Sequence, residues 1–73
     1  MSTENQVTAV TVNGEVRSFP PQTTLLELVR ALNLEPGRVA IELNRSIVKR
    51  EMWPDTTFTG GAEIEIVQFV GGG

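Results

Sequence analysis

The sequence contains no cysteine, no histidine and no tyrosine among its 73 residues. An internal disulfide is therefore impossible, and a structural zinc site is not expected because Cys and His are its usual ligands. The common nucleophiles and acid–base groups of enzymes are mostly missing, and nothing in the sequence pairs the remaining carboxylates, Lys and Ser/Thr into a site. We therefore expect no catalytic residue, no metal and no independent enzyme activity. If the chain takes part in chemistry, we expect it to be a substrate or carrier.

Positive charge and long apolar runs are scarce as well. Six Lys and Arg against nine Asp and Glu give a net charge of −3, which argues against a nucleic-acid partner because such partners need clustered basic residues. No apolar run approaches the ~18 residues that cross a bilayer. Residues 1–6 lack the basic and apolar regions of a signal peptide. We expect a cytoplasmic protein with neither nucleic acid nor a membrane as its partner.

The composition is that of one small globular domain. With 40% apolar and 21% charged residues, the chain can build a packed core and does not have the composition of a disordered protein. Its length allows one domain with one core. We predict a disordered N-terminus over residues 1–6, a folded domain over residues 7–70 and a flexible Gly-Gly-Gly tail over residues 71–73.

A β-hairpin opens the predicted domain. Residues 7–12 are rich in β-branched side chains, Asn13-Gly14 is a strong turn signal, and residues 15–19 return as a second strand. A two-residue turn would place Val12 opposite Glu15, whereas a longer, bulged loop would pair the strands differently. The sequence predicts the hairpin and leaves its register open.

One helix follows the hairpin. Thr24 and Glu27 have the spacing of a capping box, and Asn33 can adopt the left-handed conformation that ends a helix before Pro36-Gly37. An apolar stripe at helical spacing predicts one buried face, formed by Leu25, Leu28, Val29 and Leu32.

The second half of the chain is predicted to return as strands. Residues 39–43 alternate, with Val39, Ile41 and Leu43 facing inward, and Ile47-Val48 forms a short strand or strand edge. A single helical or 3₁₀ turn over residues 49–53 is closed by Pro54, and Trp53 packs at the edge of the core.

The last strand is expected over residues 62–70. Ala62, Ile64 and Ile66 face inward, whereas Val67 and Phe69 have the opposite parity, so either a bulge rotates the strand or its end presents an apolar patch to a partner. The order of elements favours an α+β fold with a mixed four- to five-stranded sheet and one main helix packed on one face.

The glycine tail is the most unusual feature. Gly has no Cβ, so the segment Gly71-Gly72-Gly73 is thin enough to enter a narrow channel, and three extended residues reach roughly 10 Å. A terminal carboxylate on such a stalk could be processed in the active site of another protein. The tail alone does not distinguish this role from that of a plain flexible end.

The whole pattern resembles the ubiquitin-like β-grasp family and, within it, the ThiS branch of the ThiS/MoaD sulfur carriers of thiamine biosynthesis. The Arg-Glu-x-Trp segment and the ending in glycines favour this branch, and the approach to the glycines is Gln68-Phe69-Val70 rather than the Pro-rich approach of the molybdopterin-synthase small subunit. The matching segments are residues 12–15, 24–29, 39–44, 48–53 and 64–73.

The resemblance implies a mechanism and a set of partners. An E1-like adenylyltransferase of the ThiF type would adenylate the Gly73 carboxylate with ATP, and a sulfur donor enzyme would convert the adenylate to a thiocarboxylate. The sulfur would then pass to a thiazole synthase of the ThiG type. No cofactor is bound by the chain itself. Gly71 and Gly72 would thread the partners' channels, and Phe58, Phe69 and Val70 are the candidates for an apolar docking surface.

Two further interpretations stay open. One is a sulfur carrier for molybdopterin or cysteine biosynthesis, and the other is a ubiquitin-like modifier or interaction module. The basic side chains Arg45, Lys49 and Arg50 either meet an acidic partner or form an ordinary solvated face.

Overall fold

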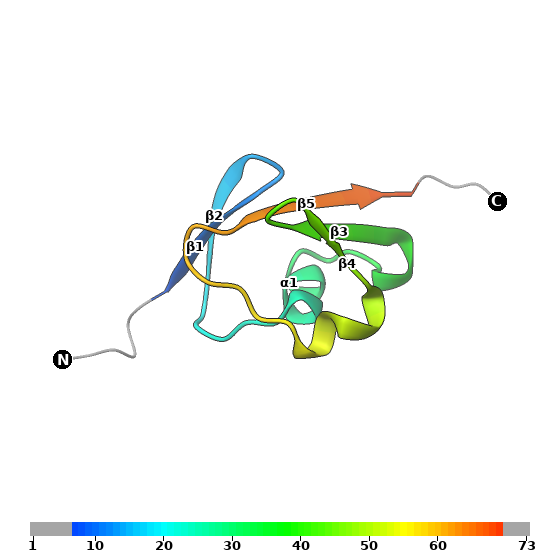
Figure 1. Ribbon diagram of the computed structural model, residues 1–73, viewed down its shortest axis with the longest axis horizontal. Coiled ribbons are helices and arrows are strands. Elements are labelled where there is room, and N and C mark those ends of the chain that lie inside the picture. The colour runs from blue at the N-terminus through cyan, green and yellow to red at the C-terminus, as the bar shows by residue number, and fades with distance from the viewer. Residues whose placement is uncertain (1–6, 70–73) are drawn as a thin grey trace.

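The computed structural model describes residues 7–69. Within these residues, five strands form one mixed sheet in the order β2-β1-β5-β3-β4, and the helix α1 packs against one face of it (Figure 1). This arrangement confirms the predicted α+β class and gives the sheet five strands. The predicted disordered N-terminus and glycine tail lie outside the described residues. The elements are β1 (Thr8–Val12), β2 (Glu15–Phe19), α1 (Leu25–Ala31), η2 (Pro36–Arg38), β3 (Val39–Leu43), β4 (Ser46–Val48), η3 (Arg50–Asp55) and β5 (Glu63–Gln68).

The hairpin of β1 and β2 has a two-residue turn. Val12 pairs with Glu15 in an antiparallel register, which resolves the register that the sequence left open. Asn13 and Gly14 have φ values of 51° and 82°, and a turn with two positive φ angles matches the right-handed twist of the flanking strands. Asn tolerates this conformation and Gly adopts it without a steric penalty.

The ends of α1 are stabilised as the sequence predicts. The Thr24 hydroxyl accepts a hydrogen bond from the Glu27 N–H at 3.1 Å, and the Glu27 carboxylate accepts one from the Thr24 N–H at 2.9 Å. At the other end Asn33 has a φ of 61°, and the Leu34 N–H donates to the Val29 carbonyl at 3.1 Å. This is the bond pattern of a Schellman cap, which satisfies carbonyls that the helix leaves free.

The connection between β4 and β5 departs from the prediction. The 3₁₀ helix η3 covers six residues and contains Pro54, so Pro54 does not close a shorter turn as expected. Pro54 is the fifth of these six residues and has no N–H to donate. The helix ends one residue later, where the Thr56 N–H donates to the Trp53 carbonyl at 3.3 Å. A short 3₁₀ helix at Pro36–Arg38 was also not predicted. No helix within residues 7–69 is long and apolar enough to cross a membrane.

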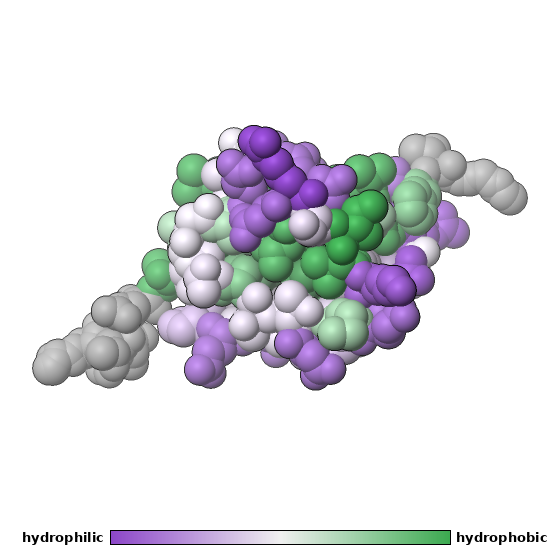
Figure 2. All heavy atoms as spheres, in the orientation of Figure 1, coloured by the Kyte–Doolittle hydropathy of each residue, from purple (hydrophilic) through white to green (hydrophobic). Residues whose placement is uncertain are grey.

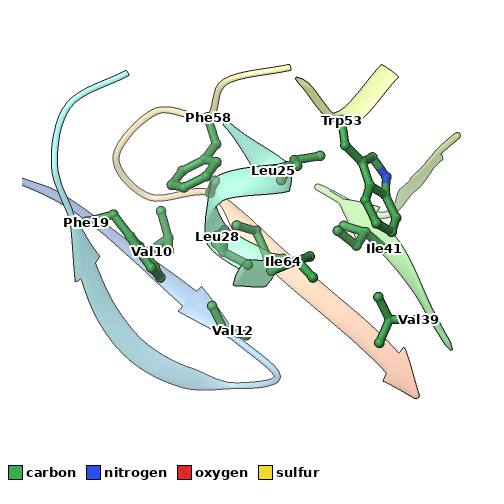
Figure 3. Close-up of a cluster of buried hydrophobic side chains, with 12 residues drawn as sticks. Val10, Val12, Phe19, Leu25, Leu28, Val39, Ile41, Trp53, Phe58 and Ile64 are labelled. Atoms are coloured by element: carbon green, nitrogen blue, oxygen red, sulfur yellow. The ribbon is translucent and has the colours of Figure 1, made fainter. Parts of the chain in front are cut away.

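The core lies between α1 and the sheet (Figure 3). Leu25, Leu28 and Val29 are fully buried, as the helical stripe predicts, whereas Leu32 is only partly buried. Trp53 is 1% exposed and therefore lies within the core, deeper than the predicted position at its edge. Its indole N–H donates to the Val48 carbonyl at 2.9 Å, so the buried polar group keeps a partner.

Phe58 belongs to the same core. It is 5% exposed, and its ring meets that of Phe19 edge to face, with centroids 5.8 Å apart and an interplanar angle of 82°. Figure 3 shows the two rings side by side at one end of the cluster. The predicted docking role of Phe58 is therefore wrong, because a ring enclosed in this way offers no surface to a partner.

Candidate functional site

The face of the sheet opposite α1 carries an apolar patch near the end of β5. Val67 and Ile47 are 59% and 74% exposed, and Phe69 is 52% exposed; together with Ala40, which pairs with Val67, they form what we call the apolar patch. Figure 2 shows hydrophobic side chains gathered over β3, β4 and the end of β5. Large exposed apolar groups that lie together mark interaction surfaces more often than single ones do.

The register of β5 explains why these side chains face outward. Its pairing with β3 runs without interruption from Leu43 opposite Ile64 to Val39 opposite Gln68, so no bulge rotates the strand. Of the two alternatives that the sequence left open, the structure therefore has the apolar patch. Strict alternation then turns Ile64 toward the core and Val67 away from it.

The last described residue is held by its backbone. The Phe69 N–H donates to the Arg38 carbonyl at 2.8 Å, so the ladder between β5 and the chain before β3 continues one rung beyond Gln68. Its side chain lines an open hollow of about 250 Å³ beside β4 and η3, with Ile47 and Trp53 among the other lining residues. The backbone is thus bonded to the sheet up to Phe69.

Arg50 joins the two 3₁₀ helices beneath this hollow. Its Nε donates to the Pro36 carbonyl at 3.0 Å, and its guanidinium lies 5.7 Å from the centre of the Trp53 ring, a cation–π distance. Arg50 therefore fixes η2 just before Arg38, the residue that binds the Phe69 N–H. Arg45 lies elsewhere, 3.6 Å from the Glu63 carboxylate and largely exposed, so the predicted basic residues do not form a single face.

The other half of the open face is acidic. Glu42 of β3 lies directly opposite Glu65 of β5, and both line a second hollow with Glu63 and Arg45. Within the described part of the chain, no group of three His, Cys, Asp or Glu side chains is arranged to hold a metal ion. The apolar patch is therefore bordered on one side by carboxylates.

The predicted site residues fall into three groups. Phe69 is exposed at the end of the sheet, where a partner can reach it, and Phe58 is in the core. Val70, Gly71, Gly72 and Gly73 lie outside the described residues. Sequence reasoning missed Ile47 as part of the patch; the signal was available, because Ile47 alternates with the core-facing Val48 on a short edge strand.

Comparisons with known proteins agree with this fold. The model of the ThiS family matches residues 10–73. A crystal structure of a thiamine biosynthesis protein (ThiS) from Geobacter metallireducens is 32% identical, covers 89% of this chain and 99% of its own, and superposes with a TM-score of 0.73. A solution structure of the Geobacter protein superposes with a TM-score of 0.74 over 89% of this chain and 87% of its own.

Two curated relatives are longer proteins. Thiazole synthases from Paramagnetospirillum magneticum and Magnetococcus marinus are each 36% identical over 62 residues, which is 85% of this chain and 19% of theirs. The chain therefore spans about a fifth of the length of the curated relatives that it matches. Because the family model covers all but the first nine residues, and because the fold matches solved members, the chain belongs to the ThiS family.

Proposed function

We propose that the chain is a sulfur carrier for synthesis of the thiazole moiety of thiamine, with the Gly73 carboxylate as the group that carries sulfur. The observation that supports this most directly is the match of the ThiS family model to residues 10–73. That range includes all three glycines of the tail. The hydrogen bond from the Phe69 N–H to the Arg38 carbonyl adds a physical reason, because it keeps the backbone ordered up to a residue only four positions before Gly73.

The proposed chemistry needs no side chain of the carrier. In an adenylyltransferase of the ThiF type, a Gly73 carboxylate oxygen attacks the α-phosphorus of ATP, and pyrophosphate leaves. Sulfide from a donor enzyme then attacks the carbonyl carbon of the acyl-adenylate, AMP leaves, and a thiocarboxylate remains. Glycine suits the two preceding positions, since Gly71 and Gly72 add no side chain that would collide with a channel wall.

A thiazole synthase is the proposed recipient of the sulfur. The two relatives named thiazole synthase contain a segment 36% identical to this chain. In each of them a carrier-like segment is therefore part of the same polypeptide as the rest of the protein. Linking two domains in this way raises their effective concentration. We infer that the present chain, as a carrier, also contacts a thiazole synthase, whether the two are separate proteins or domains of one polypeptide.

The apolar patch is the proposed docking surface for these partners. Ile47, Val67 and Phe69 are exposed on the face of the sheet opposite α1. A partner that binds the tail can therefore also cover these side chains. Val70, which follows directly after Phe69, stays a predicted docking residue. An interface of this kind gains its affinity from a few buried apolar anchors.

Complementation tests the pathway. The chain should restore growth without thiamine to a strain that lacks its own ThiS-family carrier, and deletion of Gly73 should abolish the rescue. A strain that lacks the small subunit of molybdopterin synthase should not be rescued. Rescue of the second strain alone would assign the chain to the other sulfur-transfer pathway, and rescue that does not depend on Gly73 would contradict the carrier role.

A further inference from the structure

Among residues 7–69, the end of β5 has a neighbouring strand on one side only. β5 is the central strand of the sheet, yet its parallel pairing with β1 is limited to Thr11 opposite Glu63 and Val12 opposite Ile64. β1 ends there because the chain turns back at Asn13-Gly14. Figure 1 shows the arrow of β5 running on past the hairpin, with β3 beside it.

The Asn13 side chain occupies the next position of the missing strand. Its Oδ1 accepts a hydrogen bond from the Ile66 N–H at 2.7 Å, and its Nδ2 donates to the Ile66 carbonyl at 3.2 Å. One amide side chain thus replaces one residue of a paired strand. The pairing of β5 on this side ends at Ile66.

Gln68 is the first position left open. The bonds from Phe69 to Arg38 and from Asn44 to Glu63 show that odd-numbered residues of β5 bond to β3. Residues of an antiparallel pair alternate in this respect, so the N–H and C=O of Gln68 point to the other side. There, residues 7–69 place no strand beside them.

A hollow lies next to this open edge. It measures about 260 Å³, and three partly buried apolar side chains, Leu32, Leu34 and Ile66, contribute to its lining. Arg17 and Glu15, which form an exposed ion pair at 3.5 Å, lie at its rim. The full lining is Val12, Asn13, Glu15, Arg17, Leu32, Leu34, Ile66 and Gln68.

We propose that an extended segment of the thiazole synthase adds to the sheet beside Gln68, in line with β1, and places one apolar side chain in this hollow. The open N–H and C=O supply the main-chain bonds, and the hollow supplies the side-chain pocket that strand addition uses for specificity. A helix could not satisfy the edge, because its own N–H and C=O groups are already paired.

The proposal rests on the proposed function in one respect. If Gly73 reacts in the partner's active site, four residues separate that site from Phe69, a span of at most about 14 Å. The partner must then surround the end of β5, and the Gln68 edge is the part of this strand that still has bonds to offer. Residues 70–73 folding back, or a second copy of the chain, are the other possible occupants.

The test compares backbone amides of the wild-type chain by NMR hydrogen exchange, free and bound to the thiazole synthase. The Gln68 amide should exchange freely in the free protein and become at least about tenfold slower in the complex, as a newly paired group does. The Phe69 amide, which is bonded to Arg38 in the free protein, is the internal control and should be protected in both states.

A matched pair of variants adds an affinity measurement. Gln68→Pro removes the outward N–H, and a proline is tolerated where that N–H is not used by the sheet, so the fold should remain. Loss of the N–H and crowding of the edge should weaken binding to the synthase about tenfold or more, since one hydrogen bond alone is worth a several-fold change. Gln68→Ala keeps the N–H but shortens a side chain that lines the hollow, so it should bind the synthase more tightly than Gln68→Pro does.

The outcomes separate the two claims. An unprotected Gln68 amide in the complex, or equal affinities of the Pro and Ala variants, would overturn strand addition while leaving the carrier function intact. A Gln68 amide already protected in the free chain would mean that the chain itself covers the edge, which also overturns it. If the wild-type chain does not bind the synthase at all, the proposed function fails and the inference fails with it.

Discussion

Asn13 and Ile66, which are 53 positions apart in the sequence, are joined by two hydrogen bonds between one side-chain amide and one backbone position, at 2.7 and 3.2 Å. The bonds tie the tip of the first hairpin to the strand that leads into the tail. Asn13 also forms part of the hairpin turn, where its backbone has a positive φ of 51°. A single residue thus shapes the hairpin and extends the pairing of β5.

Asn13→Gly should separate these two roles. Glycine keeps the turn conformation, so the loss reports the side-chain bonds, and thermal or urea unfolding should show a decrease of about 1–2 kcal/mol for two exposed hydrogen bonds. Asn33→Gly is the control, since Asn33 also has a positive φ and sits at a helix end where glycine is preferred. A loss for Asn33→Gly equal to that for Asn13→Gly would contradict the role given to the amide.

Leu28→Ala tests the buried face of α1. Leu28 is fully buried, and large-to-small changes at such positions cost about 2–5 kcal/mol, which is a large part of the stability of a domain this small. Arg30→Ala, on the exposed side of the same helix, should change the free energy of unfolding by less than about 0.5 kcal/mol. Equal melting temperatures for Leu28→Ala and the parent would show that the core assignment is wrong.

Two phenylalanines should behave in opposite ways. Phe58→Ala removes a buried ring and should lower the stability by about 3–5 kcal/mol. Phe69→Ala should leave the melting curve nearly unchanged, because its ring is half exposed, and should weaken binding to the adenylyltransferase or the synthase. Calorimetry and a binding titration on both variants check this. If Phe69→Ala bound both partners as tightly as the parent, Phe69 would not be part of the docking surface.

The facing carboxylates of Glu42 and Glu65 predict a stabilising substitution. Like charges directly opposite each other on a sheet are destabilising, so Glu65→Gln should raise the free energy of unfolding by about 0.2–1 kcal/mol at low salt. The gain should shrink in high salt, which screens exposed charges. Glu35→Gln, at an exposed position before η2 that makes no side-chain cap bond, should have no such effect. A gain that is independent of salt would point to a cause other than repulsion.

Local signals in the sequence account for most of the fold. The capping box of Thr24 and Glu27, the Asn13-Gly14 turn and the alternation of β3 depend on residues close together in the chain, and each prediction is confirmed. The hairpin register was settled only by the observed φ angles and pairing. Pro54 was predicted to close the turn because a proline cannot donate a backbone hydrogen bond, yet it lies inside η3, which ends at Asp55.

The candidate site was less predictable because it depends on distant contacts. Phe58 lies in a segment without periodicity, and its burial comes from Phe19, far away in the sequence. The parity of Val67 and Phe69 did signal an exposed apolar end of β5, but only the uninterrupted register with β3 excludes a bulge. The open edge at Gln68 could not be foreseen, since it follows from where β1 stops beside β5.

The most direct test of the account is the intact mass of the chain after incubation with ATP, the adenylyltransferase and a sulfur source. We expect a gain equal to the replacement of one oxygen by sulfur, located at Gly73 by fragmentation and absent when Gly73 is deleted. The Gly73 deletion should melt like the parent, because residues 7–69 contain the whole described core. An unchanged mass with partners that are active on a known carrier would contradict the proposal that this chain carries sulfur.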